Sequence, residues 1–408
     1  MRALLGIFVL LGLAFLCSER RREVPWRTVA GGMILQIVLA VILFRFPPMR
    51  AALLLVNRGA FALQAATDQG AAFVFGYLGG AALPFAATGP GSSLVLAFKI
   101  LPLVLVISAL SALLIHWGLL QLITRGLAWL LRRSLGIDGA LALGAAVHIF
   151  LGMIEAPLLI RPYLSKMQRG ELFALMCCGM AGVAGTVMVI YATMLSPVLP
   201  NALSTILVAS VISTPAALAV AAIMVPFRPG GDELPQIAQE NRPASTMDAL
   251  ARGVMDGVGP LVAIAAFLIV AVALVGLINR FLGLFDAGLT LQAIFAWPLR
   301  PVMWLIGIPW AQSGVAATLM GTKTVLNELV AYLNLAALPA NALDLKSRLI
   351  VTCALCGFAN FGSLGIMIGG IGAMVPERRS EVVNLGLRSI LAGTIATCLS
   401  GAVAGLLG

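Results

Sequence analysis

Apolar runs near 20 residues long recur along the whole chain and are separated by short polar segments. A helix needs about 20 apolar residues to cross a bilayer, so each run predicts one membrane-spanning helix. The composition agrees, because 61% of the 408 residues are hydrophobic, 10% are charged and the mean hydropathy is +1.05. We therefore expect an all-α integral membrane protein with about eight transmembrane helices. The expected spans are residues 2–17, 28–44, 93–115, 171–195, 200–226, 254–279, 347–372 and 382–407.

Basic residues indicate how the chain is oriented. The N-terminal run has one Arg followed by apolar residues, as in a secretory signal peptide, but the next segment, SERRREVPWR, has no Ala-x-Ala cleavage site. We expect a retained first helix with its N-terminus outside the inner (plasma) membrane. Four segments then lie in the cytoplasm and hold 16 of the 26 Lys and Arg residues. They are residues 18–27, 121–170, 227–252 and 376–388. The net charge of +10 comes from such short clusters, so it indicates topology rather than nucleic-acid binding.

Three further stretches fit no simple crossing. Residues 47–80 contain polar breaks, so we expect them to begin as a helix that lies along the membrane interface. Residues 120–165 and 308–340 are apolar but interrupted, and each carries a glutamate near its middle. Irregular backbone at membrane depth is tolerated only where protein buries it or a water-filled cavity solvates it. We therefore predict a re-entrant helical hairpin in each of these two stretches.

The chain also contains a weak internal repeat. The segment CGMAGVAG at 178–185 follows Glu155 of the first hairpin, and CGFANFGS at 356–363 follows Glu328 of the second. Each half then has the order helix, hairpin with Glu, interrupted Gly-rich helix and helix, with the hairpins entering from opposite sides. This order is typical of an inverted repeat whose binding site lies near the membrane midplane. Because the match is short, chance similarity between two Gly-rich helices is the alternative.

The predicted organisation has four parts. Residues 1–92 form N-terminal helices and an interfacial helix on the scaffold side, and residues 93–226 form the first repeat. Residues 227–250 form a cytoplasmic linker, and residues 251–408 form the second repeat. The linker region contains the long polar stretch FRPGGDELPQIAQENRPAST, which divides the chain without making a soluble domain.

The second half carries the densest polar constellation in apolar surroundings. Asn327, Glu328, Asn360 and Ser363 offer a carboxylate, two amides and a hydroxyl, a set that matches the adjacent hydroxyl groups of a sugar. The alternative for the Asn and Ser residues is hydrogen bonding between helices. For Glu328 that alternative is weaker, because an unpaired carboxylate at membrane depth is expensive and Lys323 is the only nearby partner in sequence.

Nothing in the sequence favours an enzyme. There is no Ser-His-Asp arrangement, no His/Cys cluster with metal-ligand spacing and no phosphate-binding glycine loop in the right context. The CALC segment at 353–356 is interpreted as small helix residues rather than a redox or metal pair. His116 is interpreted as an interfacial or packing residue. We therefore expect neither a catalytic residue nor a cofactor.

Several segments taken together resemble the concentrative nucleoside transporter family, which moves nucleosides inward on a sodium or proton gradient. The likeness covers most of the chain, and its segments are FVFGYLGG (73–80), FKILP (98–102), EAPLLIRPYL, GTKTVLNELVAY, CGFANFGSLG and PERRS (376–380). The resemblance implies an elevator-type homotrimer in which each protomer has eight transmembrane helices and two re-entrant hairpins. It also implies that Glu328, Asn360 and Ser363 hold the ribose, with Phe358 beside them.

The first hairpin departs from the family pattern. Relatives usually have Gly-Gln-Thr-Glu or Gly-Gln-Ser-Glu, where this chain has Gly152-Met153-Ile154-Glu155. The family's Gln and hydroxyl residue face the nucleobase, and losing a buried hydrogen-bond partner typically costs about 1 to 3 kcal/mol. The resemblance thus implies a base site bordered by Met153, Ile154, Glu155 and Val187, with altered selectivity. Either shape and stacking hold the base, or the substrate is not an ordinary nucleoside.

A second departure concerns the coupling cation. The family usually has Asn seven residues before the first hairpin's Glu, and here that position is His148. In the family this Asn binds sodium together with backbone carbonyls, which correspond here to those of Leu151, Gly182 and Val183. Sodium prefers hard oxygen ligands, whereas a histidine can titrate near neutral pH. We therefore expect a degraded sodium site at His148 and Gly182, no certain metal ligand, and proton coupling in preference to sodium coupling.

The leading hypothesis is a cation-coupled secondary transporter that imports nucleosides across the inner membrane, as a homotrimer in the lipid bilayer. One alternative keeps the fold but has a non-standard nucleoside-like or ribosyl substrate, or sodium as the coupling ion. In another, His148 only hydrogen-bonds across the hairpin, and Glu155 or Glu328 carries the coupling. A nontransporting sensor or membrane scaffold on the same fold is the alternative from a different functional class.

Overall fold

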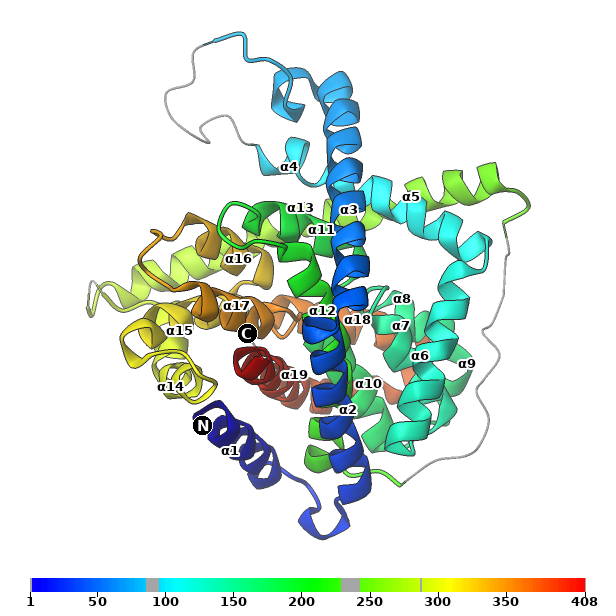
Figure 1. Ribbon diagram of the computed structural model, residues 1–408, viewed down its shortest axis with the longest axis vertical. Helices are drawn as coiled ribbons and strands as arrows, with labels where there is room; N and C mark the ends of the chain where they lie inside the picture. The colour runs from blue at the N-terminus through cyan, green and yellow to red at the C-terminus, as the bar shows by residue number, and fades with distance from the viewer. Residues whose placement is uncertain (1, 86–94, 229–242, 287, 408) are drawn as a thin grey trace.

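The computed structural model describes residues 2–85, 95–228, 243–286 and 288–407, and the regular structure in these ranges is entirely helical (Figure 1). A helix satisfies its backbone polar groups within itself, so it is the structure expected of an apolar chain in a bilayer. The predicted all-α fold is confirmed. Most of the predicted linker, residues 227–250, lies outside the described ranges.

Three helices precede the two repeats. They are α1 (Arg2–Leu16), α2 (Trp26–Arg45) and α3 (Pro47–Phe75), accompanied by the 3-10 turns η1 (Arg21–Glu23) and η2 (Gly76–Gly79). The α3 helix begins at Pro47. Proline suits the first turn of a helix because the backbone N–H that it lacks would have no hydrogen-bond partner within the helix at that position. It ends at Gly76, whose φ of +59° is readily adopted only without a side chain. The stretch 47–80 is thus one long helix and a turn, and Figure 1 shows α3 projecting away from the other helices.

The remaining helices form two sets with the same order. The first set is α4 (Leu96–Lys99), α5 (Pro102–His116), α6 (Leu119–Leu135), α7 (Gly139–His148), α8 (Glu155–Leu159), α9 (Arg161–Leu164), α10 (Arg169–Ala181), α11 (Gly185–Leu195) and α12 (Ala202–Met224). The second set is α13 (Thr246–Leu282), α14 (Leu291–Leu305), α15 (Trp310–Val325), α16 (Glu328–Ala337), α17 (Leu345–Leu355), α18 (Phe361–Met374), η3 (Pro376–Arg378) and α19 (Arg379–Leu407). Each set runs from a membrane-spanning segment through a further helix, a hairpin and a broken helix to a long last helix. The hairpin, broken helix and last helix follow in the order that the internal repeat predicts, whereas the further helix before each hairpin, α6 or α14, was not predicted.

Five of the expected spans are long and apolar enough, by length and composition, to cross a membrane as continuous segments of the described chain. They are Trp26–Arg45, Leu96–His116, Ala202–Met224, Thr246–Leu282 and Pro376–Leu407. The two expected spans with Gly-rich centres are each divided, into α10 and α11 and into α17 and α18. This confirms that both Gly-rich helices are interrupted.

Both predicted hairpins are present, although the first is shorter than expected. In the second, α15 turns at residues 326–327 into α16, within the predicted stretch 308–340. In the first, α7 turns at residues 149–154 into α8, but the predicted start of this hairpin falls in the separate helix α6. The boundary arises because Gly136, with a φ of +66°, ends α6, and the Asp138 side chain then caps α7 by accepting from the Ala140 N–H at 2.8 Å.

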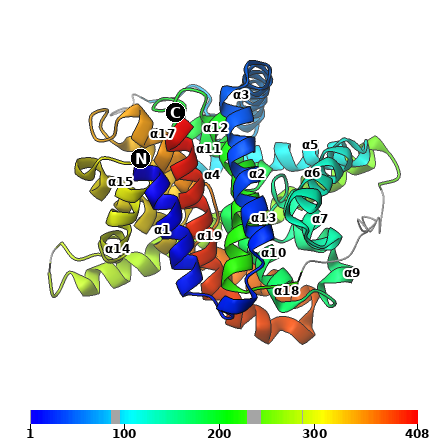
Figure 2. The same ribbon diagram turned by 60° about the horizontal axis from the view of Figure 1, so that its bottom comes forward.

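The last helices of the two sets form the centre of the molecule. α12 packs against α19, and α10 and α17 also pack against α19. In Figure 1 the hairpin α7–α8 lies on one side of α12 and the hairpin α15–α16 on the other. α2 lies along α12 and α1 along α19, as Figure 2 shows. These contacts join α1 and α2 to the repeats, and the assignment of residues 1–92 to a scaffold stays a prediction.

The α13 helix lies outside this centre and packs along α5. In the most apolar 18-residue stretch of α13, only 6% of the residues are buried inside the single chain. A surface of this kind has to be covered by lipid or by another polypeptide. Among the five candidate spans of the described chain, α13 is therefore the one most exposed to the protein's surroundings.

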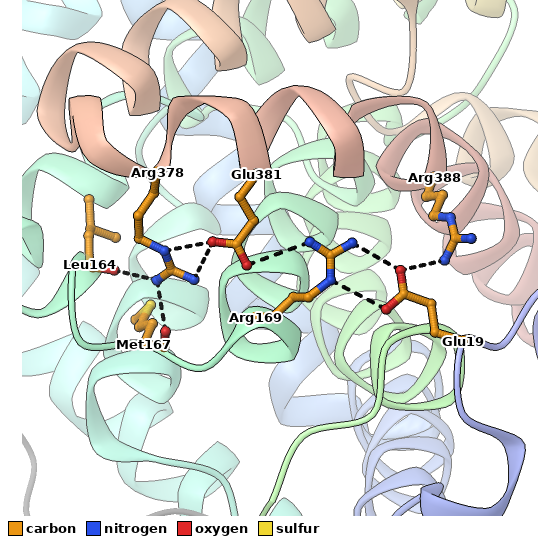
Figure 3. A network of polar contacts seen from close by, with 7 residues as sticks. All are labelled: Glu19, Leu164, Met167, Arg169, Arg378, Glu381 and Arg388. Carbon is orange, nitrogen blue, oxygen red and sulfur yellow. Dashed lines mark hydrogen bonds and ion pairs between the residues drawn. The ribbon is translucent and has the colours of Figure 1, made fainter.

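A chain of charged side chains joins three distant segments at one end of the bundle (Figure 3). Arg169, at the start of α10, donates to both oxygens of Glu19, at 3.0 and 3.3 Å, and lies 3.6 Å from Glu381 of α19. Arg388 of α19 also donates to Glu19, at 2.7 Å. Arg378 donates to Glu381 and to backbone carbonyls that follow the first hairpin. This network therefore fastens the α1–α2 connection to both repeats.

Replacing Glu19 by Gln is expected to weaken this network in a pH-dependent way. The hydrogen bond from Arg169, with the charges of Arg169, Arg388 and Arg20, lowers the pKa of Glu19 below its ordinary value of 4.5. A lowered pKa means that the stabilisation is present above pH 4.5 and is lost as the pH falls through the pKa of the folded state. Thermal unfolding should show wild type more stable by up to about 1 kcal/mol near pH 7, and this difference should vanish in acid.

The matched control is Glu23→Gln. Glu23 pairs with Arg20, but both side chains are more than half exposed, so this change should leave the stability nearly unchanged at every pH. A stability difference between wild type and Glu19→Gln that stays constant from neutral pH into acid would contradict the expectation.

Candidate functional site

The tips of the two hairpins each place a glutamate at the first position of a helix. Glu328 begins α16 and is 4% exposed, whereas Glu155 begins α8 and is exposed. Asn327 is the N-cap of α16, and its side chain accepts from the Val330 N–H at 3.0 Å. A helix N-terminus favours negative charge, because its first N–H groups are unpaired and point outward. The backbone therefore favours a carboxylate at both positions, but only Glu328 is buried.

Two side chains donate to the Glu328 carboxylate. The Tyr191 hydroxyl of α11 donates to Oε1 at 2.6 Å, and the Asn360 amide donates to Oε2 at 3.0 Å. The Asn360 side-chain oxygen in turn accepts from the Ser363 N–H at 2.7 Å and so caps α18. One hydrogen bond to each oxygen leaves the carboxylate able to accept more. Glu328, Asn360 and Ser363 are thus brought together, as the sequence predicts.

Two tyrosines that sequence reasoning missed complete this cluster. The rings of Tyr191 and Tyr332 lie 4.9 Å apart, and the Tyr332 hydroxyl donates to the Thr352 carbonyl at 3.0 Å. The predicted Val187 is buried one helical turn before Tyr191 on α11. The sequence could have indicated Tyr191, because a spacing of four residues on a helix puts its phenol on the same face as Val187.

Lys323 does not pair directly with Glu328, although it is the nearest basic residue in sequence. Its ammonium group is fully buried and donates to the Ala354 carbonyl at 2.9 Å and to the Thr397 hydroxyl at 3.2 Å. Among the ion pairs of the described residues, none joins Lys323 to Glu328. The Glu328 carboxylate is therefore stabilised by hydrogen bonds from uncharged donors rather than by a direct ion pair.

The tip of the first hairpin packs against α10 and α18. Met153 is buried, and a Cβ added at Gly179 of α10 would lie 3.3 Å from its Cβ. Ile154 lies against Gly370 of α18, where an added Cβ would come within 2.9 Å of it. The Glu155 carboxylate folds back over Gly152 and leaves no room for a side chain there. No hydrogen bond within the described ranges joins this tip to the Glu328 cluster.

The unwound segments of the two broken helices lie against each other. The Phe358 N–H donates to the Gly182 carbonyl at 3.3 Å, and the Gly185 N–H donates to the Phe150 carbonyl at 2.9 Å. The side chain of Phe358 is half-buried. A Cβ at Gly357 would lie only 2.7 Å from the Met180 carbonyl, so this crossing requires glycine. The two repeats thus meet at their interruptions.

A second polar cluster surrounds Gly182. A Cβ placed there would lie 3.4 Å from the Ser210 hydroxyl, 3.6 Å from the Cys178 carbonyl and 4.0 Å from the His148 carbonyl. His148 Nε2 and Ser210 Oγ are both buried without a hydrogen-bond partner among the described residues. Of the other predicted cation residues, Val183 in this unwound segment is buried and Leu151 is partly buried.

Sequence reasoning missed Ser210, because its hydroxyl comes from α12 and not from the hairpin or the broken helix. A buried polar atom without a partner is costly, so these atoms mark a place where a small polar species can bind. The described residues contain no group of three or more His, Cys, Asp and Glu side chains that could hold a metal ion. The arrangement suits a neutral polar molecule at Glu328 and a proton or small cation near Gly182.

Comparison with known proteins gives consistent matches over nearly the whole chain. A family model described as the Na+ dependent nucleoside transporter N-terminus matches residues 5–78, and the model for its C-terminus matches residues 205–405. A model described as nucleoside recognition matches residues 97–198.

Individual relatives agree with these matches. A putative nucleoside permease, NupX, from Escherichia coli is 33% identical over 99% of this chain and 98% of its own. The nucleoside permease NupC from Helicobacter pylori is 32% identical over 99% and 97%. The solved structure of CNTnw in an inward-facing substrate-bound state has a TM-score of 0.91 and 36% identity, and the match covers 100% of this chain and 97% of that one.

Tyr191→Phe is expected to destabilise the protein. Removing the hydroxyl leaves a buried Glu328 oxygen with one donor fewer, and a lost partner of this kind typically costs about 1 to 3 kcal/mol. Thermal unfolding in detergent measures the difference. The control is Tyr163→Phe, because Tyr163 is only half-buried and lies on α9, away from this cluster. Equal unfolding temperatures for Tyr191→Phe and wild type would argue against a structural role of the hydrogen bond.

Proposed function

This chain belongs to the concentrative nucleoside transporter family, and on that premise we propose that it imports nucleosides by symport with protons. Its fold is the elevator-type fold of CNTnw, and the family consists of multi-pass plasma-membrane transporters rather than enzymes. Cation-coupled nucleoside transport is the activity of this family. The choice of protons, the roles of individual residues and a trimeric assembly are our proposals.

The observation that carries the proposal is the buried cluster of Glu328, Asn360 and Tyr191. A carboxylate that has one donor on each oxygen can still accept hydrogen bonds from two adjacent hydroxyl groups, as on a ribose. Asn327 lies at the N-terminal end of α16 and Ser363 at the N-terminal end of α18, and both add polar groups to this cluster. Phe358, half-buried in the unwound segment, offers an aromatic contact to the sugar or the base.

We propose that the nucleobase is bounded by apolar side chains. Val187 lies one turn from Tyr191, while Met153 and Ile154 occupy the tip of the first hairpin. In the described state that tip packs against Gly179 of α10 and Gly370 of α18. Glu155 is exposed and has no hydrogen-bond or ion-pair partner among the described residues, so it can contact the base or the coupling ion.

His148 is the proposed proton carrier. Within the described ranges its Nε2 is buried without a hydrogen-bond partner, at the end of α7, and an imidazole there can take up a proton that enters with the substrate. Sodium is the second candidate, because the Ser210 hydroxyl and the carbonyls of Cys178 and His148 surround Gly182 with hard oxygen ligands. Leu151 and Val183 would add backbone carbonyls in either case.

A homotrimer is proposed from the surface of α13. This helix is almost unburied in the protomer and carries large exposed side chains, among them Ile269, Leu274 and Phe281. Pairing of α5–α13 surfaces around a threefold axis would cover part of this surface, and lipid would cover the rest.

Uptake of nucleosides into proteoliposomes tests the coupling ion. We expect a proton gradient alone to drive uptake of uridine, adenosine or inosine, and His148→Asn to lower this uptake by about tenfold or more. The same variant should gain sodium-driven uptake, because Asn supplies the oxygen that relatives have at this position.

The matched control is His116→Asn, which changes the other histidine of the chain, at the end of α5. It should transport like wild type. Wild-type uptake that responds to sodium alone would refute proton coupling, and no uptake of any nucleoside under either gradient would refute the substrate.

The double variant Met153→Gln, Ile154→Thr is expected to change base selectivity. It restores the polar pair that relatives carry, so nucleosides that differ only in base-edge donors and acceptors should change their relative KM values by about tenfold. Competition uptake with purine and pyrimidine nucleosides measures this. Unchanged selectivity, together with poor affinity for all standard nucleosides, would instead favour a modified nucleoside as the natural substrate.

A further inference from the structure

Lys323 is the most deeply buried charged side chain of the described chain, with 0% exposure. It lies in the last turn of α15, three residues before the turn of the second hairpin at 326–327. Its ammonium donates to the Ala354 carbonyl, near the C-terminal end of α17, and to the Thr397 hydroxyl of α19. The C-terminal end of a helix carries unpaired carbonyls and a partial negative charge. The ammonium is thus held by neutral oxygens on two helices.

These partners are the ligands that a small monovalent cation would use. Transporters of this general type bind coupling ions with unwound backbone carbonyls and the C-terminal ends of half-helices. Carbonyl and hydroxyl oxygens are hard ligands, well suited to an alkali cation or an ammonium group. The site around Lys323 therefore has the chemistry of a cation site whose cation is attached to the chain.

The two repeats place similar polar groups around two such sites, although the hairpin residues differ in register: His148 lies seven residues before Glu155, and Lys323 lies five before Glu328. His148 ends the first arm of the first hairpin, as Lys323 lies at the end of the first arm of the second. In the matching segments CGMAGVAG and CGFANFGS, the second residue of each is a glycine, Gly179 and Gly357. A Cβ at Gly179 would lie 3.2 Å from His148 Cε1, and one at Gly357 would lie 2.8 Å from the Thr397 methyl group. The equivalent glycines therefore border the two sites.

The last helix of each repeat supplies a hydroxyl to its site. Ser210 of α12 approaches Gly182 in the first repeat, and Thr397 of α19 approaches Gly357 in the second. In the second repeat the hydroxyl accepts from the Lys323 ammonium. In the first repeat Ser210 Oγ and His148 Nε2 are buried without a partner in the described part of the chain. In the second-repeat site the Lys323 ammonium occupies the hydroxyl oxygen. In the first-repeat site the polar atoms of Ser210 and His148 have no such partner within the described ranges.

We propose that Lys323 is a tethered cation, whose ammonium permanently fills the second-repeat counterpart of the first-repeat cation site. Each protomer then exchanges one cation per transport cycle, at the His148 site, because the equivalent position is closed to ions from solution. The fixed charge also keeps the second hairpin fastened to α17 and α19 in every state. This inference rests on the proposed cation-coupled transport and adds the number of exchangeable cations.

Lys323→Ala tests the proposal, because it removes the ammonium but leaves its oxygen ligands and a space between them. Uptake of a nucleoside transported by wild type should fall by about tenfold or more. Added ammonium or methylammonium, or sodium, should restore part of it by entering the vacated space, whereas tetramethylammonium is too large. Lys323→Met fills the same space without charge, so its loss of uptake should not respond to these cations. Lys166→Ala, which removes an exposed lysine, should behave like wild type.

Three results would overturn the proposal. The first is wild-type uptake by Lys323→Met, since then no charge is needed at this position. The second is a Lys323→Ala protein that is folded, as judged by size exclusion and nucleoside binding, but gains no uptake from any small cation. The third is a measured wild-type ratio of two coupling cations per nucleoside instead of one, a measurement that holds even if the variants do not fold. Failure of wild type to transport nucleosides would instead refute the proposed function.

Discussion

Backbone polar groups that leave a helix inside a membrane need partners within the protein, and this requirement shapes the centre of the molecule. Both repeats contain a helix that is interrupted in its middle. At these interruptions, backbone groups find hydrogen-bond partners within the protein. The Phe358 N–H donates to the Gly182 carbonyl of the other broken helix, and the Gly185 N–H donates to the Phe150 carbonyl of the first hairpin. Because the crossing needs close contact, Gly357 cannot carry a side chain there. Helix ends from both repeats are thus concentrated at one place.

The two hairpin glutamates share the same position in the backbone but not the same surroundings. Both begin a short helix, so the local backbone favours a carboxylate at each. Their surroundings differ completely, because Glu328 is enclosed by Tyr191 and Asn360 while Glu155 is exposed beside Gly152. A symmetric framework therefore carries an asymmetric site. The second repeat has a fixed arrangement of charge and donors, and the first repeat has polar atoms that are still available.

The sequence was sufficient for the features that follow from local pattern. Apolar length predicted the spans, Gly-rich centres predicted the broken helices, and a polar residue in apolar surroundings predicted Glu328 and Asn360. The structure bears out the burial of Glu328 and Asn360 and their contact, while their role in binding substrate stays a prediction. The sequence was insufficient where a side chain arrives from another helix, as Tyr191 does at Glu328, or Ser210 does at Gly182. Such contacts depend on how helices cross, which no periodicity encodes. The start of the first hairpin was also misplaced, because the apolar face of α6 resembles hairpin sequence until Gly136 and Asp138 end one helix and begin another.

The charged network at one end of the bundle has a consequence for how the chain is made. Glu19 is bound by Arg169 and by Arg388, and the last of these is 369 residues away along the chain. During synthesis, Glu19 and Arg169 are available long before α19 has been translated. The first repeat and the N-terminal helices can therefore meet early, but this end of the molecule stays incomplete until almost the whole polypeptide has entered the membrane. Final closure of the fold is then a late, post-insertion event that depends on its last helix.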